Sequence, residues 1–296
     1  MHRTYYSEPQ ATHAQRHPRS NPPPALASVT RLRCIAALMA AMIGVPVLPA
    51  QQSDSAATAA PLFTHSDAWL AAGFAVGIIA FVPFDEKIAV YSQSPSVQTS
   101  SRTSVSDAFN WFGGPGVILL SVGTYGVGRI AGSRPVSEIG LRATEAIILG
   151  SAITGVVKGA LGRQRPYVDI HDPNYFVFAK GYTDDAYTSL PSGHTTAAFA
   201  FASAVTEETA HFWPRQTWWV ATLTYGSATM VGAARIYSNN HWTTDVVAGA
   251  MVGTFSGLVV TRWHRAHPNN KLDRWLLPKS VAPTRGGIAV SWGATF

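Results

Sequence analysis

The stretch VVAGAMVGTFSGLVVT, residues 246–261, carries no charge and places Gly249, Gly253 and Gly257 four residues apart. In a helix this spacing puts all three glycines on one face. A face without side chains lets a neighbouring helix approach closely, both in membrane proteins and in soluble cores. The stretch therefore predicts a helix that packs through its glycine face.

Five more uncharged apolar stretches lie on the N-terminal side of this one, at residues 68–84, 111–128, 146–157, 195–206 and 216–234. None of them alternates between polar and apolar residues with the period of two that a half-buried strand requires. The second contains GGPG at residues 113–116, which predicts a turn or a kink. The sequence therefore predicts an all-α fold, a bundle of six helices within a domain at residues 67–265.

Whether these helices span a membrane is open at the level of sequence. A span needs about 20 apolar residues, with a lower limit near 17, and three of the six stretches reach that limit. The basic residues after residue 261 favour a cytoplasmic C-terminal end; they are Arg262, Arg265, Lys271 and Arg274. Six crossings would then also place the segment before residue 68 in the cytoplasm, whereas a cleaved signal peptide would place it outside.

The first 50 residues have the pattern of a secretory leader. A polar, Pro-rich segment with five Arg precedes CIAALMAAMIGVPVLPA, residues 34–50, which is apolar and ends in small residues. This pattern predicts a signal peptide with an extended N-terminal region, cleaved near Ala50, and a Ser/Ala-rich linker at residues 51–66. The alternative is an uncleaved anchor helix. Because Cys34 is the chain's one cysteine, cleavage would leave a chain without disulfides or cysteine ligands.

Composition and charge exclude several functional classes. The chain is 47% apolar and 13% charged, which excludes a disordered chain. Loss of residues 1–50 would lower the net charge from +6 to +2 and would leave no stripe of Lys or Arg. A nucleic-acid partner is therefore not expected.

The C-terminal tail, residues 266–296, ends in GGIAVSWGATF. Its alternation places Ile288, Val290, Trp292 and Phe296 on one side of an extended chain, which predicts a short strand.

Three polar clusters interrupt the apolar pattern. KGALGRQRP places Lys158 seven residues before Arg165, and PSGH, residues 191–194, opens an Ala-rich stretch. ARIYSNNHWTTD places Arg235 six residues before His241, with Asp245 four residues further on.

Together these residue types suit the transfer of a phosphoryl group. The three cations Lys158, Arg165 and Arg235 can surround an oxyanion, and guanidinium forks match the geometry of phosphate. Ser192 and Gly193 would lie at a helix N-terminus, whose free N–H groups attract anions. At helical spacing Asp245 would face His241 and orient its imidazole.

Each cluster has an ordinary structural interpretation when taken alone. Lys158 and Arg165 can cap helix carbonyls or meet lipid headgroups, PSGH is a common turn, and His241 with Asp245 can be a simple polar pair. Arg163 is expected to be a solvated loop charge, and the alternative is that it lines the entrance of the site. The polar residues between the first two clusters are also expected to be loop polarity; they are Asp169, His171, Asp184 and Asp185. The joint occurrence of all three clusters in order favours a functional site.

The order Lys-x6-Arg-Pro, Pro-Ser-Gly-His and Arg-x5-His-x3-Asp resembles the three-part signature of the type 2 phosphatidic acid phosphatase (PAP2) superfamily, which includes non-specific acid phosphatases and vanadium haloperoxidases. The resemblance implies the six-helix bundle of that superfamily, with His241 as nucleophile, Asp245 orienting it, and His194 as general acid and then base. It implies phosphate binding by five residues, with no metal or cofactor; these are Lys158, Arg165, Ser192, Gly193 and Arg235. Ala234 departs from the pattern, since the family usually has Ser there.

The resemblance implies a hydrolase of the bacterial cell envelope, in the inner membrane or periplasm, with its active site facing the periplasm. The apolar helices favour a lipid phosphate as substrate, either a phosphatidic acid-like monoester or an isoprenoid diphosphate. The alternative is a soluble periplasmic acid phosphatase that acts on small phosphoesters. A vanadium haloperoxidase and an inactive scaffold are further alternatives, and the oligomeric state is open.

Overall fold

The computed structural model describes residues 61–277, 280–284 and 287–291. The predicted signal peptide, residues 1–50, and most of the predicted linker lie outside the described residues.

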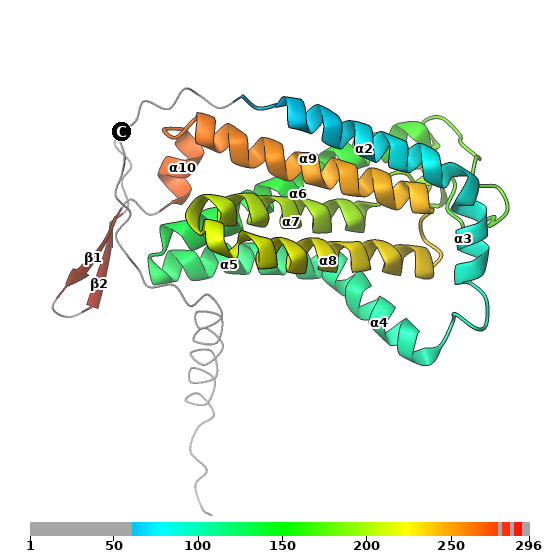
Figure 1. Ribbon diagram of the computed structural model, residues 1–296, viewed down its shortest axis with the longest axis horizontal. Coiled ribbons are helices and arrows are strands. Elements are labelled where there is room, and N and C mark those ends of the chain that lie inside the picture. Colours follow the sequence, from blue (N-terminus) through cyan, green and yellow to red (C-terminus); the bar gives the residue numbers. More distant parts are fainter. Residues whose placement is uncertain (1–60, 278–279, 285–286, 292–296) are drawn as a thin grey trace, which may run out of the picture. The chain divides into compact units, whose positions relative to one another are not determined.

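The described chain is a bundle of helices followed by a β-hairpin (Figure 1). Five of the six predicted stretches are parts of single helices, residues 111–128 are divided by a kink, and shorter helices accompany them. The helices are α2 (His65–Phe81), α3 (Asp85–Ser92), α4 (Ser100–Trp111), α5 (Val117–Ala131), α6 (Arg134–Leu161), α7 (Gly193–Phe212), α8 (Thr217–Tyr237), α9 (Thr243–Ala266) and α10 (Lys271–Leu276). Short 3₁₀ turns η1 (Val82–Phe84), η3 (Lys180–Tyr182), η4 (Asp185–Tyr187) and η5 (Pro214–Gln216), with a π-helical turn η2 (Phe112–Gly116), complete the bundle.

Helix α7 lies at the centre of the bundle, in contact with α6, α8 and α9 (Figure 1). Its interior side chains are small, and Ala200, Ala202 and Ala204 are fully buried. Because alanine adds little bulk to a helix, three neighbouring helices can reach the α7 backbone.

The glycine face predicted for α9 is confirmed, and its partner is α7. A Cβ added to Gly253 would lie 2.3 Å from the carbonyl oxygen of Thr196. Likewise, a Cβ on Gly249 would lie 2.6 Å from the Ser192 carbonyl oxygen. Since the clashing atoms belong to the α7 backbone and cannot rotate away, the distance between the two helices requires glycine at both positions.

The sequence predicts too short a helix for α6 and does not predict α3, α4 or α10. The predicted stretch 146–157 is part of a 28-residue helix whose first half carries charges. One of these, Arg142, is buried, and its Nη1 lies 2.7 Å from Oδ1 of Asp273 in α10. In the sequence, a charge that is paired inside the fold looks like a break in the apolar pattern. The predicted stretch is therefore shorter than α6.

Within the described residues, three helical segments are long and apolar enough to cross a membrane. They span residues 65–92, 134–161 and 243–266, and an 18-residue window within each has a mean hydropathy of 1.8, 1.3 and 1.4, respectively. Large apolar side chains face outward on the bundle, among them Trp69, Ile79 and Ile130. A bundle with an apolar exterior suits a lipid environment, as the predicted membrane association requires.

Only one of the three stretches that reach span length in the sequence, residues 68–84, falls in these segments. Residues 111–128 do not form one helix because η2 separates α4 from α5. Gly114 there has φ −92° and ψ −107°, which are not helical values, and Pro115 follows it. The predicted kink at residues 113–116 is therefore confirmed, and it leaves α5 only 15 residues long.

The C-terminal strand is confirmed as β2 (Gly287–Ser291). It pairs antiparallel with β1 (Ser280–Thr284), which the sequence analysis missed, and Val281 lies opposite Val290. Pro283 in β1 weakens the sequence signal for a strand, because proline cannot donate a ladder hydrogen bond. Trp292 and Phe296 lie outside the described residues.

The contact between α7 and α9 generates a test. Gly253→Val forces a side chain into the α7 backbone and is expected to destabilise the protein by about 1–3 kcal/mol. Gly155→Ala is the matched control, because no atom lies within 4 Å of a Cβ at that position of α6. The thermal unfolding midpoint of the detergent-solubilised protein should fall for the first variant and stay or rise for the second. Equal midpoints would contradict the assigned packing.

Candidate active site

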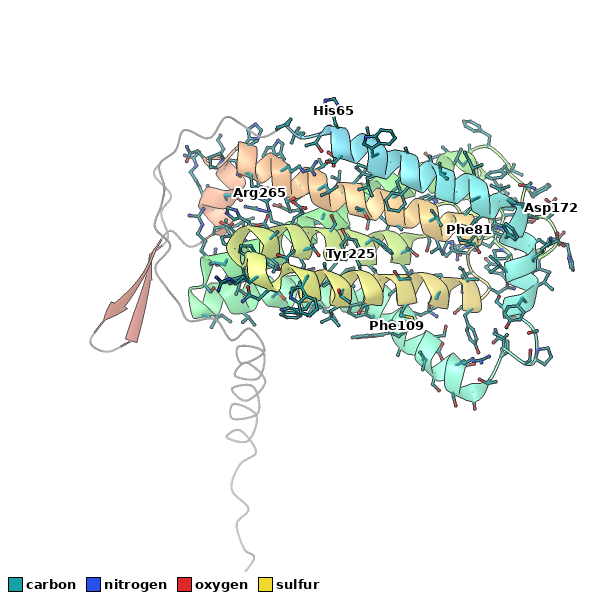
Figure 2. The ribbon with its side chains drawn as sticks, viewed as in Figure 1. His65, Phe81, Phe109, Asp172, Tyr225 and Arg265 are labelled. Atoms are coloured by element: carbon teal, nitrogen blue, oxygen red, sulfur yellow. The ribbon has the colours of Figure 1, made fainter. Side chains whose placement is uncertain are left out.

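The three polar clusters meet at one end of the bundle. The end of α6, the start of α7, the end of α8 and the start of α9 carry Lys158, His194, Arg235 and Asp245, respectively. Figure 2 shows Phe81 and Asp172 at this end of the bundle, with Arg265 toward the opposite end. The ends of four helices thus bring together residues that lie up to 87 positions apart in the sequence, from Lys158 to Asp245.

Three cations surround a common space. Lys158, Arg165 and Arg235 all interact electrostatically with His194, and Lys158 interacts with both arginines. Like charges repel one another, so this arrangement favours the binding of an anion among them.

Hydrogen bonds to neutral groups hold two of the cations in place. The Lys158 ammonium donates to the carbonyl oxygen of Thr188. Arg235 donates from Nη1 to Asn110 Oδ1 at 3.0 Å. The Nε of Arg235 is buried and has no hydrogen-bond partner among the described residues, so a donor remains for an oxyanion.

Arg165 is held by the loop that follows α6. Its Nη2 donates to the Thr188 hydroxyl at 2.8 Å and lies 3.2 Å from the Asp185 carboxylate. Its Nη1 donates to Asn240 Oδ1 at 3.3 Å. Asp185 is a polar loop residue, as expected, with a side chain that is 79% exposed, and it also pairs with Arg165.

The PSGH segment forms the start of α7. Ser192 is the N-cap residue, its backbone N–H donates to the Asp245 carbonyl oxygen at 3.0 Å, and its hydroxyl accepts from Thr195 Oγ1 at 2.9 Å. A Cβ added to Gly193 would have its nearest neighbour, Lys158 Cε, at 3.8 Å, so the protein itself leaves room for a side chain there. The helix N-terminus therefore points its free N–H groups toward the same space as the cations.

The kink at η2 lies against His194. A Cβ on Gly114 would be 2.9 Å from Nε2 of His194, so a side chain at position 114 would displace the imidazole. The sequence analysis identified the kink but not its contact with the site.

His241 and Asp245 do not lie on one helix, contrary to the expectation. His241 precedes α9, whereas Asp245 is the third residue of α9 and accepts the Trp242 backbone N–H at 2.9 Å. A carboxylate at this position caps its own helix, which leaves the preceding histidine outside the helix. The two side chains still approach each other, with 3.6 Å between His241 Nδ1 and Asp245 Oδ2, longer than a hydrogen bond.

Burial sets the protonation state of His241. The side chain is 2% exposed, and this burial lowers the pKa of the imidazole to about 3, although the neighbouring Asp245 carboxylate opposes the shift. The imidazole is therefore neutral near pH 7, which is the form that a nucleophile requires.

Arg163 is buried beneath the site, so the expectation of a solvated loop charge is wrong. Its Nη1 lies 2.6 Å from Oδ1 of Asp245, and its Nη2 lies 2.9 Å from Oδ2 of Asp85. The side chains of Arg163 and Asp85 are 5% and 1% exposed. In the sequence, Asp85 is one of two adjacent carboxylates after an apolar stretch, and nothing there connects it with position 163.

The sequence analysis also missed several neutral residues that hold the charged ones. They are Asn110, Thr188, Ser189, Asn240 and Thr244. These residues carry no spacing signal, because they come from four separate loops and helices, and only Thr188 and Ser189 are neighbours. Within the described part of the chain, no group of three or more His, Cys, Asp or Glu side chains is arranged to hold a metal ion.

Comparison with known proteins supplies independent information. Residues 140–268 match the PAP2 superfamily. The chain is 33% identical over 151 residues to a lipid A 1-phosphatase of Rhizobium etli, and 33% identical over 152 residues to that of Rhizobium johnstonii. Each match covers 50% of this chain but only 61% and 59% of the two relatives.

A solved structure shares the fold. The transmembrane PAP2-type phosphatidylglycerolphosphate phosphatase of Bacillus subtilis superposes with a TM-score of 0.53 at 19% identity, over 70% of this chain and 99% of that one. The match to the superfamily contains all three polar clusters, from Lys158 to Asp245. Residues 140–268 of this chain are therefore similar to the PAP2 superfamily over all three polar clusters of the candidate site.

Proposed function

We propose that the chain is a phosphatase that hydrolyses lipid phosphates through a phosphohistidine formed on His241. The observation that carries the proposal is the meeting of three cations, a helix N-terminus and two histidines at one end of the bundle. Such a site binds a phosphate group and places a nucleophile and a proton donor beside it.

In the first step, Nε2 of His241 attacks the phosphorus atom and the bond to the leaving oxygen breaks. His194 gives its proton to that oxygen, so the lipid leaves as an alcohol, or as a monophosphate when the substrate is a diphosphate. Asp245, which lies 3.6 Å from Nδ1, stabilises the positive charge that the imidazole acquires.

In the second step, His194 takes a proton from water, and the water oxygen attacks the phosphorus. The phosphorus–nitrogen bond breaks, its electron pair returns to Nε2, and inorganic phosphate is released. His194 thus acts first as acid and then as base.

The cations have two roles in this scheme. Lys158, Arg165 and Arg235, with the Ser192 hydroxyl and the Gly193 N–H, bind the phosphate oxygens and stabilise their charge in the transition state. Burial and the same cations lower the pKa of His194 to about 4, and a bound phosphate neutralises the cations. Binding of the substrate therefore prepares the acid that the first step requires.

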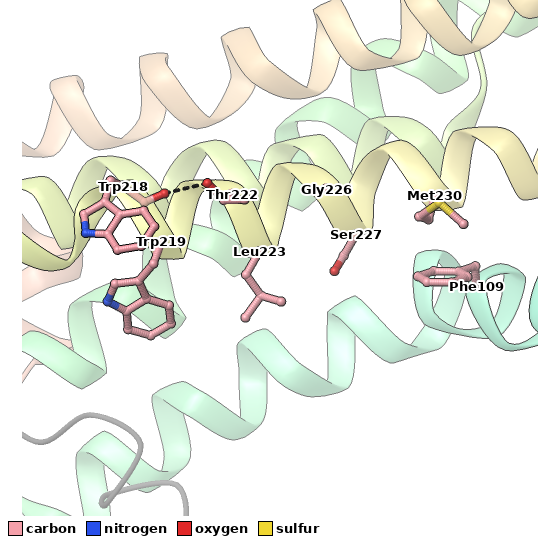
Figure 3. A pocket seen from close by; sticks show the side chains of 8 residues that line it. All are labelled: Phe109, Trp218, Trp219, Thr222, Leu223, Gly226, Ser227 and Met230. Atoms are coloured by element: carbon pink, nitrogen blue, oxygen red, sulfur yellow. Dashed lines mark hydrogen bonds between the residues drawn. The ribbon is translucent and has the colours of Figure 1, made fainter.

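The surroundings of the site support a lipid substrate. Phe176, Phe178 and Tyr182, in the loop between α6 and α7, expose their rings as residues at a membrane surface do. An apolar groove of about 410 Å³ runs along α8 from Trp218 to Met230 (Figure 3).

One end of this groove is lined by Phe109, which is next in the chain to a hydrogen-bond partner of Arg235. Figure 3 shows Phe109 of α4 beside Met230, and the next residue after Phe109, Asn110, accepts the hydrogen bond from Arg235. An acyl or isoprenoid chain along α8 can thus lie in the groove while its phosphate binds the cations. The names of the two Rhizobium relatives also favour a lipid phosphate.

The substrate class is tested by parallel assays of phosphate release with EDTA present. The substrates are a diacyl phosphatidate, a lipid A carrying a 1-phosphate, an isoprenoid diphosphate and a water-soluble aryl phosphate. His241→Ala should lower turnover by at least about 1,000-fold, because it removes the nucleophile. His171→Ala is the matched control, since His171 is 70% exposed and, among the described residues, its side chain pairs only with Glu86.

Faster turnover of a lipid than of the aryl ester is the expected result. Preference for the aryl ester would favour a soluble acid phosphatase. No release above the His241→Ala background would contradict a phosphatase, and oxidation of halide with added vanadate would then identify a haloperoxidase.

We also propose that residues 67–265 are the phosphatase domain, with the site on the periplasmic side of the inner membrane. The basic residues that follow residue 261 lie in the last turns of α9 and beyond, and Figure 2 shows Arg265 at the end opposite to Phe81 and Asp172. Basic ends of membrane proteins favour the cytoplasm, which places the site outside.

This orientation is tested with single cysteines in a Cys34→Ser background, where no other cysteine remains. Phe178→Cys and Trp275→Cys place a thiol at exposed positions, which are 84% and 73% accessible. In right-side-out membrane vesicles a membrane-impermeant maleimide should label the first variant only, and both after permeabilisation. Labelling of Trp275→Cys alone in intact vesicles would contradict the orientation.

A further inference from the structure

We propose that Arg163 is a positioning residue, itself fixed by Asp85. It holds the Asp245 carboxylate in place, and together with Asp85 it determines the net charge beneath His241 during phosphoryl transfer. The inference rests on the proposed function and assigns roles to two residues that lie outside the three motifs.

Arg163 is held on every side of its guanidinium group. Nη1 donates to the Asp245 carboxylate at 2.6 Å and to the Thr244 hydroxyl at 2.7 Å. Nη2 donates to Asp85 at 2.9 Å and to the Pro173 carbonyl oxygen at 2.7 Å, which also accepts from Nε at 3.0 Å. A planar group with its donors committed in this way has one orientation, so it fixes the carboxylate that it binds.

Asp85 joins this arrangement from a distant part of the chain. It is the first residue of α3, is 1% exposed, and accepts the Thr244 N–H at 2.9 Å and the Thr244 hydroxyl at 2.5 Å. The carboxylate thus holds the first turn of α9 and the Arg163 guanidinium group together. Because His241 directly precedes this turn, Asp85 fixes the chain that carries the nucleophile.

The charges of the three groups add a second effect. Two carboxylates and one guanidinium, all nearly inaccessible to water, carry one net negative charge beneath His241. The imidazole gains positive charge when Nε2 bonds to phosphorus, and a buried negative charge stabilises it. Without the charge of Asp85, Arg163 would neutralise Asp245, and phosphorylation of His241 would slow.

A purely structural role is the competing explanation, since a buried ion pair can serve only to connect α3 with α9. The two explanations differ in what a conservative change affects. Loss of a structural clamp disturbs phosphate binding and stability together with turnover, whereas loss of positioning and charge lowers kcat while the phosphate-binding cations remain in place.

The test compares Asp85→Asn with Glu86→Gln in the full-length, detergent-solubilised protein. Asparagine keeps the shape of the side chain and an oxygen for the Thr244 N–H, while it removes the charge. Glu86 is the matched control, because it is the next residue, is 47% exposed and pairs with no residue other than His171 in the described part of the chain. The measurements are kcat and KM with the preferred substrate, the inhibition constant of vanadate, and the thermal unfolding midpoint.

For Asp85→Asn we expect kcat to fall about 10- to 100-fold, with KM and the vanadate constant within about threefold of wild type. Glu86→Gln should match wild type in all four quantities. Unchanged kcat in Asp85→Asn, or a loss of vanadate binding that parallels the loss of kcat, would overturn the inference.

A second variant covers the case in which Asp85→Asn does not fold. Thr244→Val keeps every charge and removes only the hydroxyl that bonds Arg163 and Asp85, and kcat should fall about 3- to 10-fold at constant vanadate affinity. Wild-type kcat in Thr244→Val would overturn the inference. Wild-type protein without phosphatase activity would overturn the proposed function and this inference together, whereas active wild type with an unaffected Asp85→Asn overturns only the inference.

Discussion

The geometry of the site depends on the buried carboxylate of Asp245. One oxygen accepts from Arg163, and the other accepts from the Ser189 hydroxyl and the Trp242 backbone N–H. Through these bonds a single side chain caps α9, fixes the loop that carries His241 and anchors the segment before α7. A buried carboxylate with this many donors is stable only where all of them are in place, so the first turn of α9 has one arrangement.

The bundle supplies the frame in which this arrangement is held. Small residues bring α7 and α9 into backbone contact, and Gly249 lies directly against the carbonyl oxygen of Ser192. The PSGH turn and the Asp245 turn therefore touch each other, and the Ser192 N–H donates to the Asp245 carbonyl oxygen. Close helix packing thus places the anion-binding helix N-terminus beside the nucleophile.

Sequence reasoning succeeds where the information is local. Five of the six apolar stretches correspond to single helices, the glycine face of α9 packs as its spacing indicates, and the kink at residues 113–116 follows from its glycines and proline. The three clusters also indicate that their charged residues belong together, because no simpler pattern explains their order.

Sequence reasoning fails where a residue is defined by partners far along the chain. Arg163 looks like a loop charge because its two carboxylate partners lie 78 and 82 positions away. Arg142 interrupts the apolar pattern of α6 for the same reason, since its partner lies in α10. His241 and Asp245 show the opposite error. Their spacing of four residues predicts that they share one helix, but α9 begins between them.

The central claim is that the phosphoryl group passes through His241, and trapping that intermediate tests it most directly. His194→Ala should allow an aryl phosphate, whose leaving group needs little help from an acid, to phosphorylate the enzyme while water attack is slowed. Mass spectrometry after an alkaline quench is predicted to find one phosphoryl group, on the peptide that contains His241. A phosphoryl group on another residue, or steady release of phosphate without any phosphorylated protein, would contradict the account.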